Sequence, residues 1–293
     1  MRIIEILKQK ISFDDLIIGI GVGEKKNQNI KIFTTALDFS IKNQVWIYLF
    51  GEKKAIHEIK SYQLNNSPRQ SKIKLISSIE PEKEMITYLI NNKINAIVRG
   101  SFKSSEFLKL LKDSLKIKNI YRLALLETVK GVQFFFGPVG IDECKNFNEK
   151  KKFIEKSLEL FEKLKIKPKI SILSGGRLTD VGRDKSVDET IDDAENLVKY
   201  FRNQKPNIEI FHDQILIENS IKNGANLILA PNGISGNLIY RTLIHLGNGK
   251  SYGAVYLDIK YILIDTSRIA PKNELNGALY MASSIFSVEK SKS

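Results

Sequence analysis

The sequence predicts an α/β protein with mainly parallel sheets, and three observations lead to that prediction. Short apolar runs alternate with segments whose apolar residues recur at helical spacing, which is typical of βαβ units. The helical segments have the length that a crossover between parallel strands needs. With 293 residues, the chain can bury a sizeable core, organised as one large or two smaller lobes.

Ten apolar runs are the expected strands. They span residues 16–20, 45–50, 74–76, 96–99, 132–136, 170–173, 208–211, 227–230, 254–257 and 261–265. Ten strands are too many for one small lobe, so we expect two α/β/α lobes. We place the first lobe at 1–127, with 259–293 returning to it, and the second lobe at 128–258.

Two helices are the clearest between these strands. Residues 148–165 carry Ile154, Leu158 and Phe161 at helical spacing, which predicts one buried face. A second helix is expected over 186–203, where Ser186 and a glutamate three residues later have the spacing of a capping box.

Composition narrows the classes of partner. Lys and Arg (46) exceed Asp and Glu (33), but the basic residues are spread over the whole chain without an aromatic-interleaved stripe, so we expect no nucleic-acid partner. No apolar run reaches the ~18 residues of a membrane span, and no signal peptide is visible, so we expect no membrane association. The lone Cys144 forbids an internal disulfide and fits a cytoplasmic protein. We interpret it as a spare thiol, and the three histidines lack metal-ligand spacing, so we expect no metal site.

The run at 262–274 is the most informative motif. An apolar strand ends in Thr266, Ser267 and Arg268, and Pro271 then opens a helix. A hydroxyl and a guanidinium at the carboxyl end of a strand, beside a helix start, form an anion site. We therefore expect an anionic small-molecule substrate.

Three further loops follow expected strands. The first offers Arg99, Lys103 and Ser104, a pattern that fits an anion site and a capped surface helix equally well. The second, SGGRLTDVGRD, offers Gly175, Gly176 and Arg177; we favour ligand binding over a loop in which Asp180 and Asp184 pair its own arginines. The third, APNGISGNLIYR, has the substrate-binding candidates Asn232, Gly236, Asn237 and Arg241, with Gly236 and Asn237 expected to open a helix.

The GIGVG run at 19–23 has glycines suited to a nucleotide loop. The dinucleotide pattern requires another glycine where this chain has Glu24. A tight connection from strand to helix explains the run better.

Taken in order, these motifs resemble the phosphate acetyl/butyryltransferase superfamily. The residues concerned are Pro231-Asn232, Ser235-Gly236-Asn237, Tyr240-Arg241, Gly253 and Ser267-Arg268, with VRGSFKSSEFLK and DQILIENSI upstream. The combination of GIGVGE, FFFGPVG and LSGGRLTDVGRD is closer still to the MtxX group of methanogenic archaea, a methanogenesis marker family labelled a methyltransferase subunit.

The resemblance implies two α/β/α lobes of the isocitrate dehydrogenase-like architecture, a site in the interlobe cleft and commonly a homodimer. By resemblance, Arg268 would stabilise an acyl phosphate, Ser267 would position a thiol and Glu274 would act as base. Four residues depart from the acyltransferase pattern. Asp213-Gln214 replaces Gly-Pro, while Glu218 and Glu274 each replace an aspartate.

Three functions stay open on these grounds. The first is a transferase of the MtxX type in methyl or C1 metabolism, and the second is a phosphate acyltransferase acting between phosphate and coenzyme A. The third is a non-catalytic sensor or assembly factor that keeps the cleft. No cofactor is evident in the sequence, although coenzyme A or a methyl carrier fits the first two functions.

Overall fold

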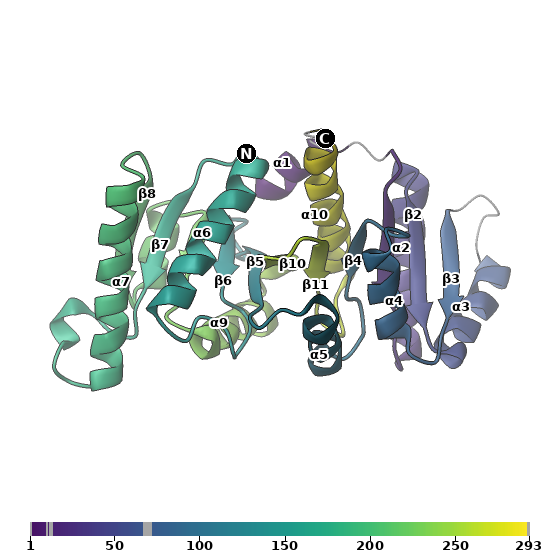
Figure 1. Ribbon diagram of the computed structural model, residues 1–293, viewed down its shortest axis with the longest axis horizontal. Helices are drawn as coiled ribbons and strands as arrows, with labels where there is room; N and C mark the ends of the chain where they lie inside the picture. Colours follow the sequence, from purple (N-terminus) through teal and green to yellow (C-terminus); the bar gives the residue numbers. More distant parts are fainter. Residues whose placement is uncertain (1, 10, 12–13, 67–71, 292–293) are drawn as a thin grey trace. The chain divides into compact units, whose positions relative to one another are not determined.

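The computed structural model describes residues 2–9, 11, 14–66 and 72–291 (Figure 1). It has a mixed α/β fold whose strands are mostly parallel, which confirms the predicted fold class. The chain divides into two compact units, which we describe separately. Unit 1 comprises 3–119 and 252–293, and unit 2 comprises 120–251.

Unit 1 contains a sheet with the strand order β3-β2-β1-β4-β11-β10. Its strands are β1 (Ile17–Gly21), β2 (Trp46–Gly51), β3 (Ile73–Ser77), β4 (Ala96–Val98), β11 (Ile262–Asp265) and β10 (Lys250–Leu257), which enters this unit at Tyr252. The first five run parallel, and β10 is antiparallel to β11. The carboxyl ends of β1, β2, β4 and β11 therefore share one edge of the sheet.

Helices cover the strands of unit 1 in two groups. Helix α4 (Pro81–Ile90) packs on β1, β2 and β4 and against α5 (Ser104–Leu115). Helix α10 (Lys272–Lys290) packs on β4 and β11, and it contacts α1 (Ile3–Gln9) and α2 (Lys26–Asn43). Helix α3 (Lys53–Asn66) lies against β2 and α2.

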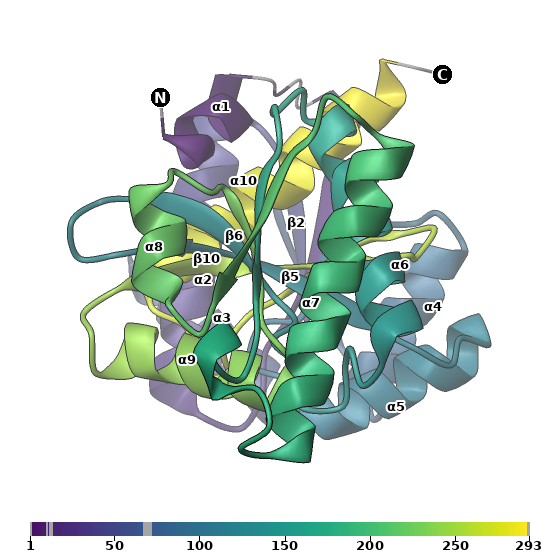
Figure 2. The same ribbon diagram turned by 90° about the vertical axis from the view of Figure 1, so that its left-hand side faces the viewer.

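Unit 2 contains five further strands in the order β5-β6-β9-β7-β8. Its strands are β5 (Tyr121–Glu127), β6 (Gln133–Gly137), β9 (Leu227–Leu229), β7 (Lys169–Leu173) and β8 (Glu209–Gln214). Only β5 is antiparallel to its neighbour β6. Its helices are α6 (Phe147–Lys163), α7 (Lys185–Gln204), α8 (Ile217–Lys222) and α9 (Gly233–His245), with a short 3-10 turn, η1 (Leu178–Asp180). Figure 2 shows α6 and α7 on one side of these strands and α8 and α9 on the other.

The expected division differs from these units at both boundaries. Strand β5 was not predicted, and the sequence-based boundary near Glu127 left it in the first lobe. All seven of its residues are buried, and it pairs with β6 through Ala124–Glu127, which places it in unit 2. The second unit also ends at Ser251 rather than at residue 258.

Several expected helix starts are wrong. Asp184, not Ser186, caps α7, since its carboxylate accepts hydrogen bonds from the N–H groups of Ser186 and Val187. Helix α9 begins at Gly233, three residues before Gly236, because Asn232 is its N-cap. Helix α5 has Lys103 at its N-cap position without a side-chain capping bond, so it is not the capped surface helix that one interpretation of this loop expected.

Gly100 marks the closest approach in unit 1. Its φ is +65°, and a Cβ there would lie 2.1 Å from the carbonyl oxygen of Gly21. Only glycine allows the loop after β4 to cross the end of β1 at this distance.

We predict that Gly100→Ala lowers the free energy of unfolding by at least about 2 kcal/mol, because left-handed strain and a backbone clash add. Gly131→Ala is the matched control. Gly131 also has a positive φ, but nothing lies within 4 Å of its added Cβ, so only the strain remains, about 1 kcal/mol. Urea denaturation measures both variants, and equal losses would contradict the assignment of a close contact at Gly100.

Candidate functional site

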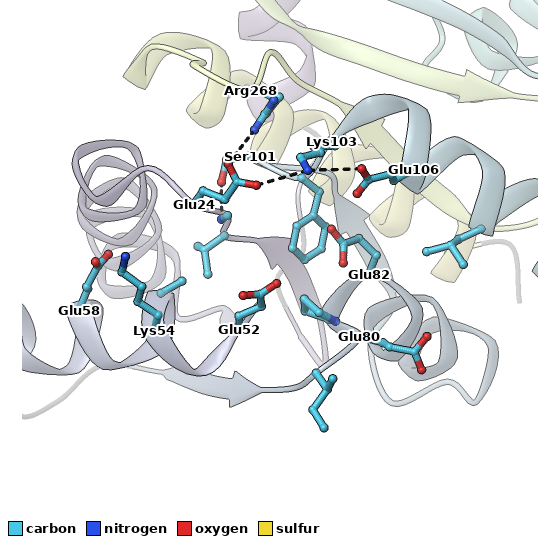
Figure 3. Close-up of a pocket in the computed structure, with 17 residues that line it drawn as sticks. Glu24, Glu52, Lys54, Glu58, Glu80, Glu82, Ser101, Lys103, Glu106 and Arg268 are labelled. Atoms are coloured by element: carbon cyan, nitrogen blue, oxygen red, sulfur yellow. Dashed lines mark hydrogen bonds and ion pairs between the residues drawn. The ribbon is translucent and has the colours of Figure 1, made fainter.

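Unit 1 contains a cavity of about 390 Å³ at the carboxyl ends of its parallel strands. It is lined by the loops that follow β1, β2, β4 and β11, and by the starts of α3, α4 and α5 (Figure 3). Every lining residue belongs to unit 1. Ligands of open α/β sheets bind at this edge, so the cavity is the candidate site.

Two basic side chains share one carboxylate in this cavity. Lys103 Nζ lies 3.4 Å from Glu24 Oε1, and Arg268 Nη2 lies 3.8 Å from Glu24 Oε2. Figure 3 shows Glu24 between them, with Glu106 on the other side of Lys103 at 3.4 Å. Hydrogen bonds to Glu24 and Glu106 raise the pKa of Lys103, which stays cationic. Two of the predicted residues, Lys103 and Arg268, thus line the cavity together.

Arg99 has a different role from the one expected. It is 4% exposed and does not line the cavity. Its guanidinium donates to the Asp265 carboxylate and to the carbonyl oxygens of Phe102 and Thr266. Arg99 therefore braces the loop after β4 against the loop after β11. Ser104, the first residue of α5, also lies outside the lining.

The Ser267–Arg268 turn is fixed by Glu274, in the first turn of α10. Ser267 donates its backbone N–H to Glu274 Oε1 at 2.7 Å. The pKa of Glu274 is raised to about 7, mainly by burial. The charge of Asp265 also raises it, while the Ser267 N–H and Arg99 lower it. Ser267 and Glu274 stand behind the lining, and only Arg268 of this trio faces the cavity.

The loop after β1 uses its own polar groups internally. Gly23 donates its N–H to Ser101 Oγ at 2.8 Å and to Asn29 Oδ1 at 3.0 Å, and Asn29 donates back to the carbonyl oxygen of Gly23 at 2.7 Å. The structure thus supports the interpretation of GIGVG as a tight connection from strand to helix.

The other predicted binding residues lie in unit 2. Gly175, Gly176 and Arg177 follow β7, where Arg177 has an exposed side chain and Asp180 accepts from the Arg177 N–H and from Arg183. The loop thus satisfies part of its own charge, as the alternative interpretation expected.

The α9 candidates also have roles within the protein. Asn232 caps the helix, Asn237 donates to the carbonyl oxygen of Val139 at 2.8 Å, and Gly236 packs against Pro138. Arg241 is exposed. Substrate binding by these residues stays a prediction.

Beneath the loop that follows β7 in unit 2, a hydroxyl, an imidazole and a carboxylate form a hydrogen-bonded series. Ser174 Oγ lies 2.8 Å from His212 Nε2, and His212 Nδ1 lies 2.5 Å from Glu195 Oε1. The order is that of a hydrolase triad. However, Ser174 is 1% exposed and also bonds the carbonyl oxygen of Gly176, so we interpret the series as a brace for the glycine loop.

The sequence analysis missed the acidic lining of the cavity. Six glutamates contribute to it: Glu24, Glu52, Glu58, Glu80, Glu82 and Glu106. The sequence did contain an indication of this acidic lining. Glu24 and Glu52 come shortly after strand ends, and Glu82 lies in the first turn of α4.

Other candidate chemistries find little support in the described residues. Cys144 is buried, and burial together with Glu143 and Glu149 raises the pKa of its thiol, which stays protonated. Within the part of the chain that the structure describes, no group of three or more His, Cys, Asp or Glu side chains is placed to hold a metal ion. None of the described helices is long and apolar enough to span a membrane.

Comparison with curated proteins gives close relatives in methanogens. The chain is 36% identical over 275 residues to "Putative methyltransferase mtx subunit X" of Methanosarcina barkeri, which covers 94% of this chain and 95% of that protein. It is 41% identical over 203 residues to an uncharacterized methyltransferase of Methanocaldococcus jannaschii, covering 67% of this chain and 81% of that protein. The chain belongs to the MtxX family. No protein-family model matches it.

Solved structures share the fold of this MtxX-family chain. A phosphotransacetylase from Streptococcus pyogenes has a TM-score of 0.72 at 13% identity, covering 98% of both chains. A branched-chain phosphotransacylase from Enterococcus faecalis has a TM-score of 0.68 at 16% identity, covering 92% of this chain and 99% of that one. The resemblance to the acyltransferase superfamily is thus confirmed at the level of the fold.

Glu274 gives a testable pH dependence of stability. Its pKa is about 7 in the folded chain against 4.5 ordinarily, so the folded chain holds a proton that the unfolded chain loses. The proton on Glu274 contributes fully to the free energy of unfolding below pH 4.5, and this contribution is lost as pH rises to 7. Its loss lowers the free energy of unfolding by up to about 3 kcal/mol.

We expect Glu274→Gln to remove this dependence, so that the stability of the variant relative to wild type rises by about 2 kcal/mol between pH 5 and pH 8. Urea denaturation at both pH values measures it. Glu84→Gln, a variant in α4 away from the cavity lining, serves as control. A gap between Glu274→Gln and wild type that is the same at both pH values would contradict the shifted pKa.

Proposed function

We propose that this protein is a transferase of the methyltransferase mtx type that binds the anionic part of its substrate in the cavity of unit 1. Support for the reaction class comes from the names of relatives that match nearly the whole chain. Support for the site comes from one observation above all: Lys103 and Arg268 meet at the same carboxylate inside a cavity at the carboxyl ends of parallel strands.

In the proposal, the substrate's carboxylate or phosphate takes the place of Glu24. The side chains of Lys103 and Arg268 are each 43% exposed, so both can change partner without breaking a buried ion pair. The side chain of Glu24 is 70% exposed, so its carboxylate can move aside. The guanidinium offers a planar fork of donors suited to either kind of anion.

Glu274 has a positioning role in this scheme. Its carboxylate holds the Ser267 N–H at 2.7 Å and thereby sets the direction in which Arg268 leaves the turn. With a pKa of about 7, it also exchanges a proton near neutral pH. The bond to Ser267 is strongest while Glu274 is ionised, so we expect anion binding by Arg268 to improve as pH rises through 7.

A second candidate is acyl transfer between phosphate and coenzyme A. The observation that favours it is the Ser267–Arg268 turn held by a carboxylate that titrates near pH 7. The relatives' names describe a subunit, so we extend the main proposal to action with other protein chains. Pairing with a second copy of the chain and a site in an interlobe cleft stay predictions.

A thermal-shift panel tests both candidates with wild type, Arg268→Ala and the control Lys272→Ala, which changes a neighbouring exposed cation outside the lining. The ligands are phosphate, acetyl phosphate, coenzyme A, S-adenosylmethionine, tetrahydromethanopterin and a corrinoid. At ~100 times its Kd, a ligand raises the midpoint by roughly 2–4 °C. A shift with a methyl carrier that Arg268→Ala abolishes supports the main proposal. A shift with coenzyme A or acetyl phosphate alone supports the second candidate, and no shift with any ligand overturns both.

We predict that Glu24→Gln tightens the binding of inorganic phosphate about two- to fivefold, because an exposed carboxylate no longer competes for Lys103 and Arg268. Isothermal titration calorimetry at low salt measures the change, with Glu58→Gln as the control for charge at the cavity. If Glu24→Gln weakens binding, or if Glu58→Gln tightens it equally, the proposed displacement is wrong.

A further inference from the structure

The cavity of unit 1 is lined by more acidic than basic residues, whereas the whole chain has more basic than acidic residues. The chain carries 46 Lys and Arg against 33 Asp and Glu, whereas the cavity is lined by six glutamates and by the three basic residues Lys54, Lys103 and Arg268. An anion alone would therefore meet two cations at one end of the cavity and an excess of negative charge over the rest.

These glutamates differ in their pairing. Glu24 and Glu106 contact Lys103, and Glu80 lies 3.0 Å from Lys83. Glu52, Glu58 and Glu82 form no ion pair with any residue that the structure describes; Glu52 is exposed, and Glu58 and Glu82 are half-buried. Figure 3 shows the carboxylates of Glu52 and Glu82 turned toward the interior of the lining, the first from the end of β2 and the second from the first turn of α4.

The two carboxylates repel each other. Glu82 is partly buried, and that burial is the main cause that raises its pKa. The charges of Glu106 and Glu52 raise this pKa as well, while its own backbone N–H and the charge of Lys103 lower it. Two like charges facing one partly enclosed space are relieved by a cation placed between them.

Apolar side chains also line the cavity. They include Phe102 and Val22, which are 2% and 1% exposed, together with Ala55 and Pro81. An aromatic ring attracts organic cations through its negative face, and apolar walls suit alkyl groups rather than a hydrated metal ion.

We propose that the cavity binds a small organic zwitterion. Its alkylammonium or sulfonium group lies between Glu52 and Glu82 beside Phe102, and its carboxylate or phosphate lies against Lys103 and Arg268. The anionic end rests on the proposed function above, whereas the cationic end rests on the unpaired carboxylates and on the apolar side chains of the lining.

Three simple probes separate the two ends in calorimetric titrations of the full chain. They are tetramethylammonium for the cation, inorganic phosphate for the anion and phosphocholine for both. We expect phosphocholine to bind more tightly than either single-charge probe. Glu52→Gln and Glu82→Gln should each weaken tetramethylammonium and phosphocholine about tenfold without weakening phosphate. Arg268→Ala should weaken phosphate and phosphocholine but leave tetramethylammonium unchanged.

Glu84→Gln is the matched control, because it makes the same charge change on α4 outside the cavity lining. Circular dichroism checks that each variant is folded. If phosphate binds through Arg268 while tetramethylammonium does not bind, the zwitterion inference is wrong and the proposed anion site stands. If tetramethylammonium binds through Glu52 and Glu82 while phosphate does not bind, the cationic end is supported and the anion site is wrong. Binding of neither probe overturns both.

Discussion

The buried guanidinium of Arg99 is the interaction on which the site depends. A charge removed from water is tolerated only where the protein supplies partners, and Arg99 has the Asp265 carboxylate and the carbonyl oxygens of Phe102 and Thr266. These partners lie in two loops far apart in the sequence. Satisfying one side chain therefore fixes the loop that ends in Lys103 and the loop that presents Arg268.

A second constraint comes from Glu274, which completes the same buried cluster. Its neighbours Asp265 and Arg99 act on its pKa in opposite directions, and burial exceeds both. The cluster thus holds two carboxylates against one guanidinium, and a proton on Glu274 lowers the negative charge at little structural cost. The side chain that anchors the Ser267 N–H is consequently also the group of this cluster that titrates near neutral pH.

Much of the scaffold could be predicted from the sequence, because apolar runs and crossover lengths report directly on parallel strands. Strand β5 could not, because the run YRLALLE has no alternation and includes Arg122 and Glu127. Arg122 is buried there with the Glu143 carboxylate as a partner, which accepts from its Nε at 2.7 Å and from its backbone N–H. Such a pair joins residues that are distant in the sequence, so a local sequence pattern cannot reveal it.

The candidate site, too, could be predicted only as far as local sequence patterns allow. Position after a strand end led to the prediction of Lys103 and Arg268, which do line the cavity, since topology alone brings such residues to one edge. The direction in which each side chain points decides whether it lines the cavity, and the sequence does not show this direction. Arg99 turns inward to its partners, whereas Lys103, four residues later, reaches the cavity. Glu24 attracted attention in the sequence only as a missing glycine, and its contact with both cations depends on loops that meet in three dimensions.

The opposite signs of chain and cavity explain how a common fold can serve a distinct chemistry. A net charge of +13 draws anions toward the protein from a distance, without regard to their identity. At close range, Glu52 and Glu82 penalise an anion that lacks a compensating positive group, because their own charge has no partner in the described chain. Long-range attraction and short-range repulsion together favour ligands with both charges, and the selection is made by side chains on loops and helix starts rather than by the strands beneath them.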